Sequence, residues 1–348
     1  FARERRVFYF EEPIFEDSNA PRLDVSHRGE GLYIVVPHVP HGTSPEQIEA
    51  SQRELLDQMR QEHAIGDFIL WYYTPMAHGF SDHLEPLVTV FDVMDELSAF
   101  KNAPQQLLDR ESAVLKRADV VFTGGHSLFE AKRDRHHNVY AFPSSIDREH
   151  FAQARMPLAE PSDQASVPHP RIGFFGVLDE RFDIELLAGL AEAKPDWHFV
   201  MIGPVVKIDP SDLPQGNNIH YLGGKQYSEL PAYIAGWDVA SLLFARNEST
   251  QYISPTKTPE YLAAARPVVS TSIRDVIRPY GDEGVVEIAD TVEDFVAATQ
   301  RMLTMTDRDD WLARVDEMLS KTSWDQTWAG MSALIAQAMT SRTTNRNS

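Results

Sequence analysis

Short apolar segments alternate with helical segments along nearly the whole chain, and this alternation constrains the fold more than any other feature. Apolar runs at residues 120–123, 171–175 and 198–202 have the length of buried strands. Residues 105–117 and 184–193 carry apolar side chains at helical spacing. Strands that alternate with helices favour parallel sheets covered on both faces. The pattern therefore predicts an α/β protein built from doubly wound units.

The other apolar segments form two such sets, separated by a stretch without apolar period. Further strands are expected at residues 7–10, 32–37, 68–73, 87–91, 139–142, 219–222, 239–244, 267–270 and 285–288, and further helices at 44–63, 227–235, 258–265, 292–305 and 324–339. Residues 155–170 are rich in Pro, Ser and Ala and indicate an inter-domain linker or a long surface loop. We expect a first domain over residues 1–160, a second over 161–322, and over 323–348 a C-terminal helix that packs back toward the first domain and ends in a frayed tail.

The start of the chain departs from this pattern. Residues 1–6, FARERR, resemble the last turn of a helix, with the cations that helix ends favour. An α/β domain rarely begins with the end of a helix. We therefore expect that a first strand and a first helix of the first domain precede residue 1.

The net charge limits the partners that the chain can bind. Its 348 residues include 52 acidic and 32 basic side chains, which give a formal net charge of -20, and no cysteine. Nucleic-acid-binding domains need a basic face, so no nucleic-acid partner is expected. The lack of cysteine excludes disulfides and thiolate metal sites, and no apolar run approaches the ~20 residues that span a bilayer. These features predict a soluble cytoplasmic protein and leave the oligomeric state open.

The histidines and the one dense basic run form no recognisable site. The pairs His38/His41 and His136/His137 have no convincing third ligand, so no metal site is predicted. The basic run KRDRHH at residues 132–137 is expected to be a solvated face. Peripheral docking to anionic lipid at the inner face of the membrane is the alternative for this run.

Three strand-to-helix junctions in the second half carry glycines, hydroxyls and cations. No G-x-x-x-x-G-K-[ST] motif occurs and no G-x-G-x-x-G follows a strand, so a P-loop ATPase and a dinucleotide dehydrogenase are not expected. Helix N-termini offer free N–H groups to phosphates. The residues expected to bind a diphosphate are Gly176, Arg181, Lys225, Ser254, Thr256 and Lys257. Gly203 would line the same cleft, and Glu260 could reach a ribose or sugar hydroxyl; simple turns and helix caps remain the alternative for each junction.

Carboxylates follow one buried strand of the first half. Asp92 and Asp95 lie at the carboxyl end of this strand, where α/β sheets bind ligands, and could orient acceptor hydroxyls or act as a base. They could instead cap the next helix. Thr123 and Gly124 end another strand and would face the same cleft, or form only a tight turn.

Several of these segments resemble one family. The pattern S-P-T-K-x-x-E-Y-L-A-A-x-x-P-V-V at residues 254–269 resembles the nucleotide-sugar domain of GT-B glycosyltransferases of the family 4 or group 1 type. Residues 90–96, 118–125 and 142–147 resemble a bacterial subgroup that includes teichuronic acid biosynthesis glycosyltransferases. The resemblance covers roughly residues 5–335 and implies two Rossmann-like domains that face an inter-domain cleft.

This resemblance also implies an activity. Such an enzyme moves a sugar from a nucleoside diphosphate sugar, a UDP or GDP co-substrate, to a hydroxyl on a glycan or a lipid-linked acceptor, and retains the anomeric configuration. Arg181, Lys225 and Lys257 would stabilise the leaving diphosphate, so that neither a metal nor another cofactor is required. Glu260 would orient the donor, and the carboxylates after the first-half strand would face the acceptor.

Two departures from the family pattern keep other functions open. Tyr252 stands where the family usually carries the first Glu of a Glu-x7-Glu motif, and Phe91 stands where many members have a His often credited with catalysis. A GT-B nucleotide- or glycan-binding protein that has lost catalysis is one alternative. A GT-B UDP-sugar epimerase is another, although it would need a second carboxylate beside Glu260.

Overall fold

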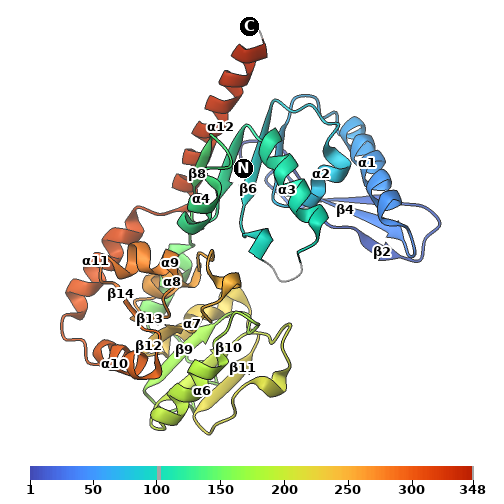
Figure 1. Cartoon of the computed structure of the whole chain (residues 1–348). Coiled ribbons are helices and arrows are strands. Elements are labelled where there is room, and N and C mark those ends of the chain that lie inside the picture. The colour runs from blue at the N-terminus through green and yellow to red at the C-terminus, as the bar shows by residue number, and fades with distance from the viewer. Residues whose placement is uncertain (100–102, 347–348) are drawn as a thin grey trace.

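The computed structural model describes residues 1–99 and 103–346, and within them the strands form three sheets (Figure 1). The strands are β1 (Val7–Phe10), β2 (Ile14–Glu16), β3 (Arg22–His27), β4 (Leu32–Pro40), β5 (Ile69–Tyr72), β6 (Val88–Val93), β7 (Val120–Thr123), β8 (Val139–Ala141), β9 (Arg171–Phe175), β10 (His198–Ile202), β11 (Ile219–Gly223), β12 (Val239–Leu242), β13 (Val268–Ser270) and β14 (Val286–Ile288). The α-helices are α1 (Pro45–Glu62), α2 (His78–Ser81), α3 (Gln105–Arg117), α4 (His126–Lys132), α5 (Arg148–Ala152), α6 (Ile184–Ala193), α7 (Leu230–Ala235), α8 (Lys257–Ala263), α9 (Arg274–Val276), α10 (Val292–Leu303), α11 (Arg308–Ser320) and α12 (Trp324–Arg346).

The sheet of the second half, sheet C, has six parallel strands in the order β11-β10-β9-β12-β13-β14. In chain order this is 3-2-1-4-5-6, the order of a doubly wound nucleotide-binding fold. The order reverses between β9 and β12. Sheets of this kind bind ligands beyond the carboxyl ends of the strands at such a switch point.

Strand β10 shows why this half folds as a covered sheet. Val200 and Ile202 belong to one hydrophobic cluster, whereas Phe199 and Met201 belong to another. Because successive side chains of a strand point to opposite faces, a strand covered on both sides needs an unbroken apolar run. The sequence carries this run, so the predicted and observed bounds of β10 agree.

Sheet B, in the first half, contains the parallel strands β5-β6-β7-β8. Val93 packs with residues of α3 and α4 on one face, and Val90 packs with Met331 and Ile335 of α12 on the other. Helix α12 therefore returns from the second half to cover the first (Figure 1). Among the described residues, no helix combines the length and apolar character that a membrane span requires.

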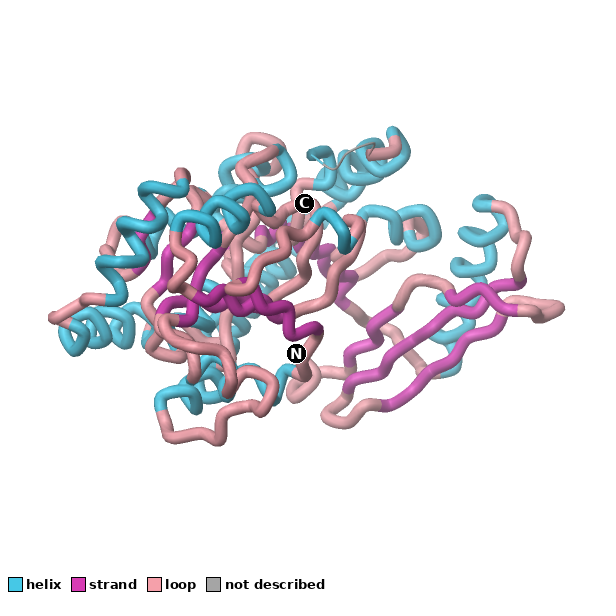
Figure 2. Tube along the Cα trace, turned by 90° about the horizontal axis from the view of Figure 1, so that it is seen from below, coloured by secondary structure: helices cyan, strands magenta, loops and turns pink. Residues whose placement is uncertain are grey.

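Sheet A, also in the first half, was not predicted as a separate sheet. Its strands β1 and β2 pair with β4 in parallel, and β3 pairs with β4 in antiparallel fashion. Figure 2 shows the strands of sheet A apart from the other sheets. The sequence reading missed β2 and β3, because β2 has only three residues and both are largely exposed. The predicted helix end before β1 is a turn, in which Glu4 N and Arg5 N donate to the carbonyl oxygen of Phe1.

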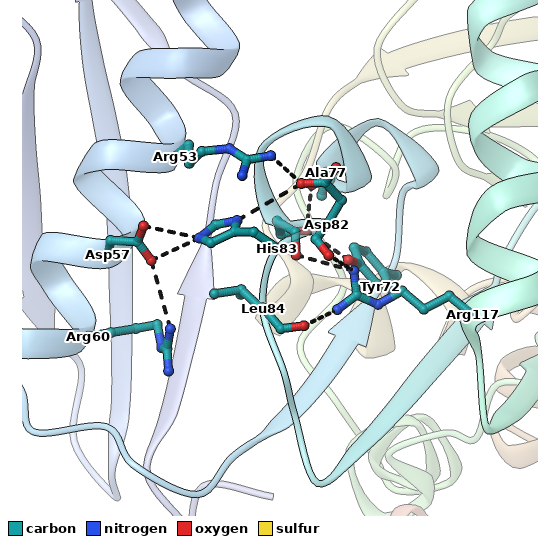
Figure 3. A network of polar contacts seen from close by, with 10 residues as sticks. Arg53, Asp57, Arg60, Tyr72, Ala77, Asp82, His83, Leu84 and Arg117 are labelled. Carbon is teal, nitrogen blue, oxygen red and sulfur yellow. Dashed lines mark hydrogen bonds and ion pairs between the residues drawn. The ribbon is translucent and has the colours of Figure 1, made fainter.

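A polar network joins sheet A to sheet B through α1 (Figure 3). Helix α1 packs on sheet A through Leu56, and its Asp57 carboxylate contacts Nε2 of His83 at 2.9 Å. Arg117, at the end of α3, donates to the carbonyl oxygen of Asp82 at 2.7 Å. Arg53 of α1 pairs with the carboxylate of the same Asp82. These contacts hold sheet A beside sheet B.

The stretch predicted as a linker packs against the second half. Gln164 is fully buried; its amide oxygen accepts from Nε1 of Trp237 at 3.0 Å, and its Nε2 donates to the carbonyl oxygen of Tyr233 at 3.0 Å. Arg155, at its start, pairs with Asp316 of α11 at 2.8 Å. Residues 155–170 are thus an ordered part of the second half's surface rather than a free tether.

Candidate active site

Two glycine turns lie next to each other at the carboxyl ends of β9 and β10. Gly176 and Gly203 both have φ +146, in a region that other residues rarely adopt. A Cβ on Gly203 would overlap the carbonyl group of Gly176, and a Cβ on Gly176 would overlap the side chain of Lys257. The backbone at both turns therefore approaches its neighbours as closely as only glycine allows.

Replacing Gly203 by alanine is expected to lower the free energy of unfolding by about 2–4 kcal/mol, because strain in φ adds to the overlap with Gly176. Gly224 is a matched control, since a Cβ there meets nothing within 4 Å. Its replacement by alanine should change stability by less than about 0.5 kcal/mol. Urea unfolding measures both, and equal effects would contradict the close approach of the two turns.

Lys257 begins α8 directly above the Gly176 turn. Its ammonium lies 5.9 Å from the ring centroids of both Phe174 and Phe244. Among the described residues, no hydrogen bond or ion pair reaches this ammonium within the usual distance limits. Burial lowers the pKa of Lys257, while the Glu260 carboxylate opposes that effect. A half-buried cation without an ion-pair partner could accept an anion.

Glu260 lies one turn further along α8. Its Oε2 atom is buried and has no hydrogen-bond partner within the described part of the chain. Burial raises the pKa of Glu260 to about 7, even though Lys257 acts to lower it. Perturbed, unsatisfied groups of this kind concentrate at functional sites. The helix start thus presents an unsatisfied carboxylate beside a cation that lacks a direct partner.

Arg181 provides the second cation of this cluster. Its guanidinium pairs with Asp179 at 2.6 Å, so its charge is largely balanced inside the protein. Burial acts to raise the pKa of Asp179, but Arg181 holds this pKa below its usual value. Burial raises the pKa of Asp95, and Arg181 opposes this from the other half of the chain. Arg181 therefore links the donor-side residues of the second half to Asp95 of the first.

Asp92 faces a different space from Asp95. It is 5% exposed and borders a cavity of about 470 Å³ lined by aromatic residues that include Trp71, Tyr73 and Trp328. Burial raises the pKa of Asp92 to about 6, and the Trp71 indole opposes this. The structure therefore separates the two predicted acceptor-side carboxylates, and only Asp95 interacts with the Arg181 cluster.

Ser254 and Thr256 precede α8, as the sequence suggested. The Thr256 side chain makes no capping hydrogen bond, so its hydroxyl does not serve the helix start. Ser254 lies against Gly125 of the first half, where an added Cβ would come 2.7 Å from the Ser254 Cβ. The loop before α8 therefore contacts both the cation cluster and the first half.

Lys225 does not join the cation cluster. Its ammonium pairs with Asp163 at 2.7 Å and lies 5.2 Å from the ring centroid of Tyr233. The segment predicted as a linker supplies a counter-ion for Lys225, and its role in binding a diphosphate stays a prediction. No sequence signal joins two residues that lie 62 positions apart.

Thr123 and Gly124 do not open onto the cleft as expected. Thr123 is fully buried, and its hydroxyl donates to the carbonyl oxygen of Gly125 at 3.0 Å. An added Cβ on Gly124 would lie 3.1 Å from Cε of Met94. Both residues shape the turn that leads into α4.

The two departures from the family pattern are packing residues. Phe91 is 1% exposed in the cluster between sheet B and α3, so it points away from Asp92. Tyr252, in the loop before α8, packs against that same first-half cluster. An aromatic ring at position 252 therefore serves the contact between the two halves.

Two functional candidates were missed by sequence reasoning. Asp179 sits two positions before Arg181 in the same turn, and this spacing could have signalled the pair. Asp275 contacts the start of α4 from the second half, 149 positions away, and no local pattern reveals it. Among the described residues, no group of three or more His, Asp or Glu side chains is arranged to hold a metal ion.

Comparisons with known proteins show what the whole chain is similar to. Residues 169–305 match the family model of group 1 glycosyl transferases. TuaH of Bacillus subtilis (strain 168) is 25% identical over 276 residues, which cover 72% of this chain and 67% of TuaH. Its name describes it as a teichuronic acid biosynthesis glycosyltransferase. The sucrose-phosphate synthase (tll1590) of Thermosynechococcus elongatus superposes with a TM-score of 0.69 at 15% identity, covering 94% of this chain and 89% of that one.

A further solved structure is Anabaena Alr3699/HepE in complex with UDP. It superposes with a TM-score of 0.66 at 14% identity, covering 87% of this chain and 86% of that one. At such low identity these superpositions establish the fold alone, which is the predicted α/β fold of the GT-B type. The second half is doubly wound, as predicted, whereas the parallel sheet of the first half has its strands in sequential order. The match to the family model over residues 169–305 and the curated relative add to this fold a similarity to group 1 glycosyl transferases.

Proposed function

We propose that the protein transfers a sugar from a nucleoside diphosphate sugar to a hydroxyl of a glycan or lipid-linked acceptor. The observation that carries this proposal is the half-buried Lys257 side chain, whose ammonium makes no ion pair among the described residues and lies beside the unsatisfied Glu260 carboxylate. A charge that is partly removed from water and lacks a partner is costly, and a bound diphosphate would offset that cost. The UDP bound to Alr3699/HepE supports UDP as the nucleotide, with GDP as the other candidate.

The proposed chemistry assigns one role to each residue of the cluster. As the bond between the sugar and the diphosphate breaks, negative charge develops on the diphosphate, and Lys257 with Arg181 would stabilise it. Glu260 would accept hydrogen bonds from hydroxyls of the ribose or the sugar. Asp95, which interacts with Arg181, would face the acceptor hydroxyl. We further propose retention of the anomeric configuration and no metal requirement.

The division of labour between the halves is also part of the proposal. Residues 1–160 would bind the acceptor, residues 161–322 would bind the donor, and the helix within 323–348 would tie the two together. The name of TuaH supports an acceptor in a bacterial wall polysaccharide. We propose a cytoplasmic location. Lys132, the first residue of the basic run at 132–137, is fully buried and does not take part in any contact of this run with a membrane.

Nucleotide-sugar binding is expected to raise the melting temperature of the protein in the presence of EDTA. Ligand at 100 times its Kd stabilises the folded state by about 2.7 kcal/mol. Thermal unfolding with UDP-glucose, UDP-N-acetylglucosamine and GDP-mannose measures this effect. Lys257→Ala should abolish the shift, whereas Lys225→Ala should keep it, because Lys225 is already paired with Asp163.

Each component of the proposal has its own contrary result. No shift with any of the three sugar nucleotides would contradict the proposed function. A shift that appears only when a divalent cation replaces EDTA would contradict metal independence. An unchanged shift in Lys257→Ala would contradict the placement of the diphosphate.

A further inference from the structure

The start of α4 receives a carboxylate from the other half of the chain. Oδ2 of Asp275 accepts from the backbone N–H of His126 at 2.9 Å, and Oδ1 accepts from the backbone N–H and the hydroxyl of Ser127 at 2.9 and 2.5 Å. Asp275 is 5% exposed and Ser127 is 3% exposed. A buried carboxylate with three donors makes a strong, directional contact.

The backbone around this contact is shaped to admit it. A Cβ on Gly125 would overlap the Asp275 carboxylate, so a glycine is needed just before α4 for the two halves to meet this closely. Ser254, from the loop before Lys257, lies against the same glycine. Arg274 forms a half-exposed ion pair with Glu130 at the edge of the contact. The loop of the cation cluster and the start of α4 are therefore in direct contact.

The other end of α4 holds the loop that carries Asp95. Lys132, the last residue of α4, is fully buried and binds Glu96 at 2.8 Å and Glu111 of α3 at 2.7 Å. Burial acts to raise the pKa of Glu96, but hydrogen bonds from Lys132 and Ser98 hold this pKa below its usual value. Glu96 is adjacent to Asp95 in the chain, so the position of one constrains the other.

We propose that α4 couples docking of the two halves to the placement of Asp95, with Asp275 as the positioning residue. A seven-residue helix is about 10 Å long and moves as one unit, so a shift at His126 reaches Lys132. Docking of Asp275 would fix α4, α4 would fix Glu96 through Lys132, and Asp95 would then face Arg181. The inference rests on the proposed function only in taking Asp95 as a residue that faces the acceptor.

Amide hydrogen exchange on the full chain tests the coupling without any substrate. In Asp275→Ala, protection should fall at the start of α4 and also, by about two- to thirty-fold, in the segment 93–99. Arg274→Ala removes the neighbouring ion pair and should leave residues 93–99 unchanged. Exchange in β10 serves as the reference for global destabilisation, because that strand lies in the core of sheet C.

The conservative variant Asp275→Asn keeps one acceptor for the α4 amides and should restore part of the protection at both segments together. Loss of protection at α4 alone, with residues 93–99 unchanged, would overturn the coupling. An equal response to Arg274→Ala would overturn the role of Asp275. Failure of the proposed function would appear separately, as absent nucleotide-sugar binding by the wild-type protein.

Discussion

Replacing Glu260 by glutamine is expected to raise the free energy of unfolding at pH 8 by about 3 kcal/mol. Burial raises the pKa of this carboxyl from 4.5 to about 7 in the folded protein, so the folded state binds its proton more tightly than the unfolded state does. Stability therefore falls as the pH rises from about 4.5 to about 7, and it stays at the lower level above that range. A neutral glutamine at position 260 removes this loss.

Urea unfolding between pH 5 and pH 8 measures the effect. The wild-type protein should lose stability across this range, and Glu260→Gln should lose less. Asp92→Asn is the matched variant: the pKa of Asp92 is raised from 3.8 to about 6, so its effect should be complete at a lower pH. Parallel pH profiles for the wild type and Glu260→Gln would contradict the raised pKa of Glu260.

The stabilised Glu260→Gln variant should at the same time bind nucleotide sugars more weakly. A charged carboxylate accepts hydrogen bonds from hydroxyls more strongly than a neutral amide does. Opposite changes in stability and binding are typical of groups held in an unfavourable environment for the sake of function. A residue with a purely structural role would not show this opposition.

Whether a strand could be predicted from the sequence depended on how deeply the strand is buried. Sheet C is covered on both faces, and its strands β9 and β10 appear in the sequence as unbroken apolar runs with the correct bounds. Strands β2 and β3 are largely exposed, so they leave no such run. Helix α11 was missed as well, because only three of its thirteen residues, Trp311, Val315 and Leu319, are buried.

The sequence could indicate candidate site residues where they stand at strand-to-helix junctions. Gly176, Lys257 and Glu260 stand at strand-to-helix junctions, and doubly wound folds bring such junctions together at one edge of the sheet. The pairing of Lys225 with Asp163 and the docking of Asp275 on α4 join residues 62 and 149 positions apart. Contacts between such distant positions depend on tertiary packing, which local patterns do not encode.

The two aromatic residues that depart from the family pattern, Phe91 and Tyr252, pack at the same place in the structure. Tyr252 packs on a cluster that contains Phe91 and residues of α3 and α4, so both aromatic departures serve the same apolar body. The loop before Lys257 thus packs against this cluster of the first half.

Replacing Lys132 by methionine is expected to lower the free energy of unfolding by about 3–5 kcal/mol. Lys132 is fully buried between the carboxylates of Glu96 and Glu111, and its removal leaves buried negative charge without compensation. Arg135 still binds Glu111 at 2.7 Å, so the larger change should fall on Glu96. The exposed Lys116 on α3 is a matched control, and Lys116→Met should change stability by less than about 0.5 kcal/mol.

The pH dependence of this loss identifies its cause. The bond from Lys132 stabilises the charged form of Glu96, so its contribution is present above pH 4.5 and disappears as the pH falls below the lowered pKa. Urea unfolding of Lys132→Met should therefore differ most from the wild type near neutral pH and approach it in acid. A deficit that does not change with pH would show that Lys132 matters for its packing alone, and α4 would then hold the Asp95 loop by shape rather than by charge.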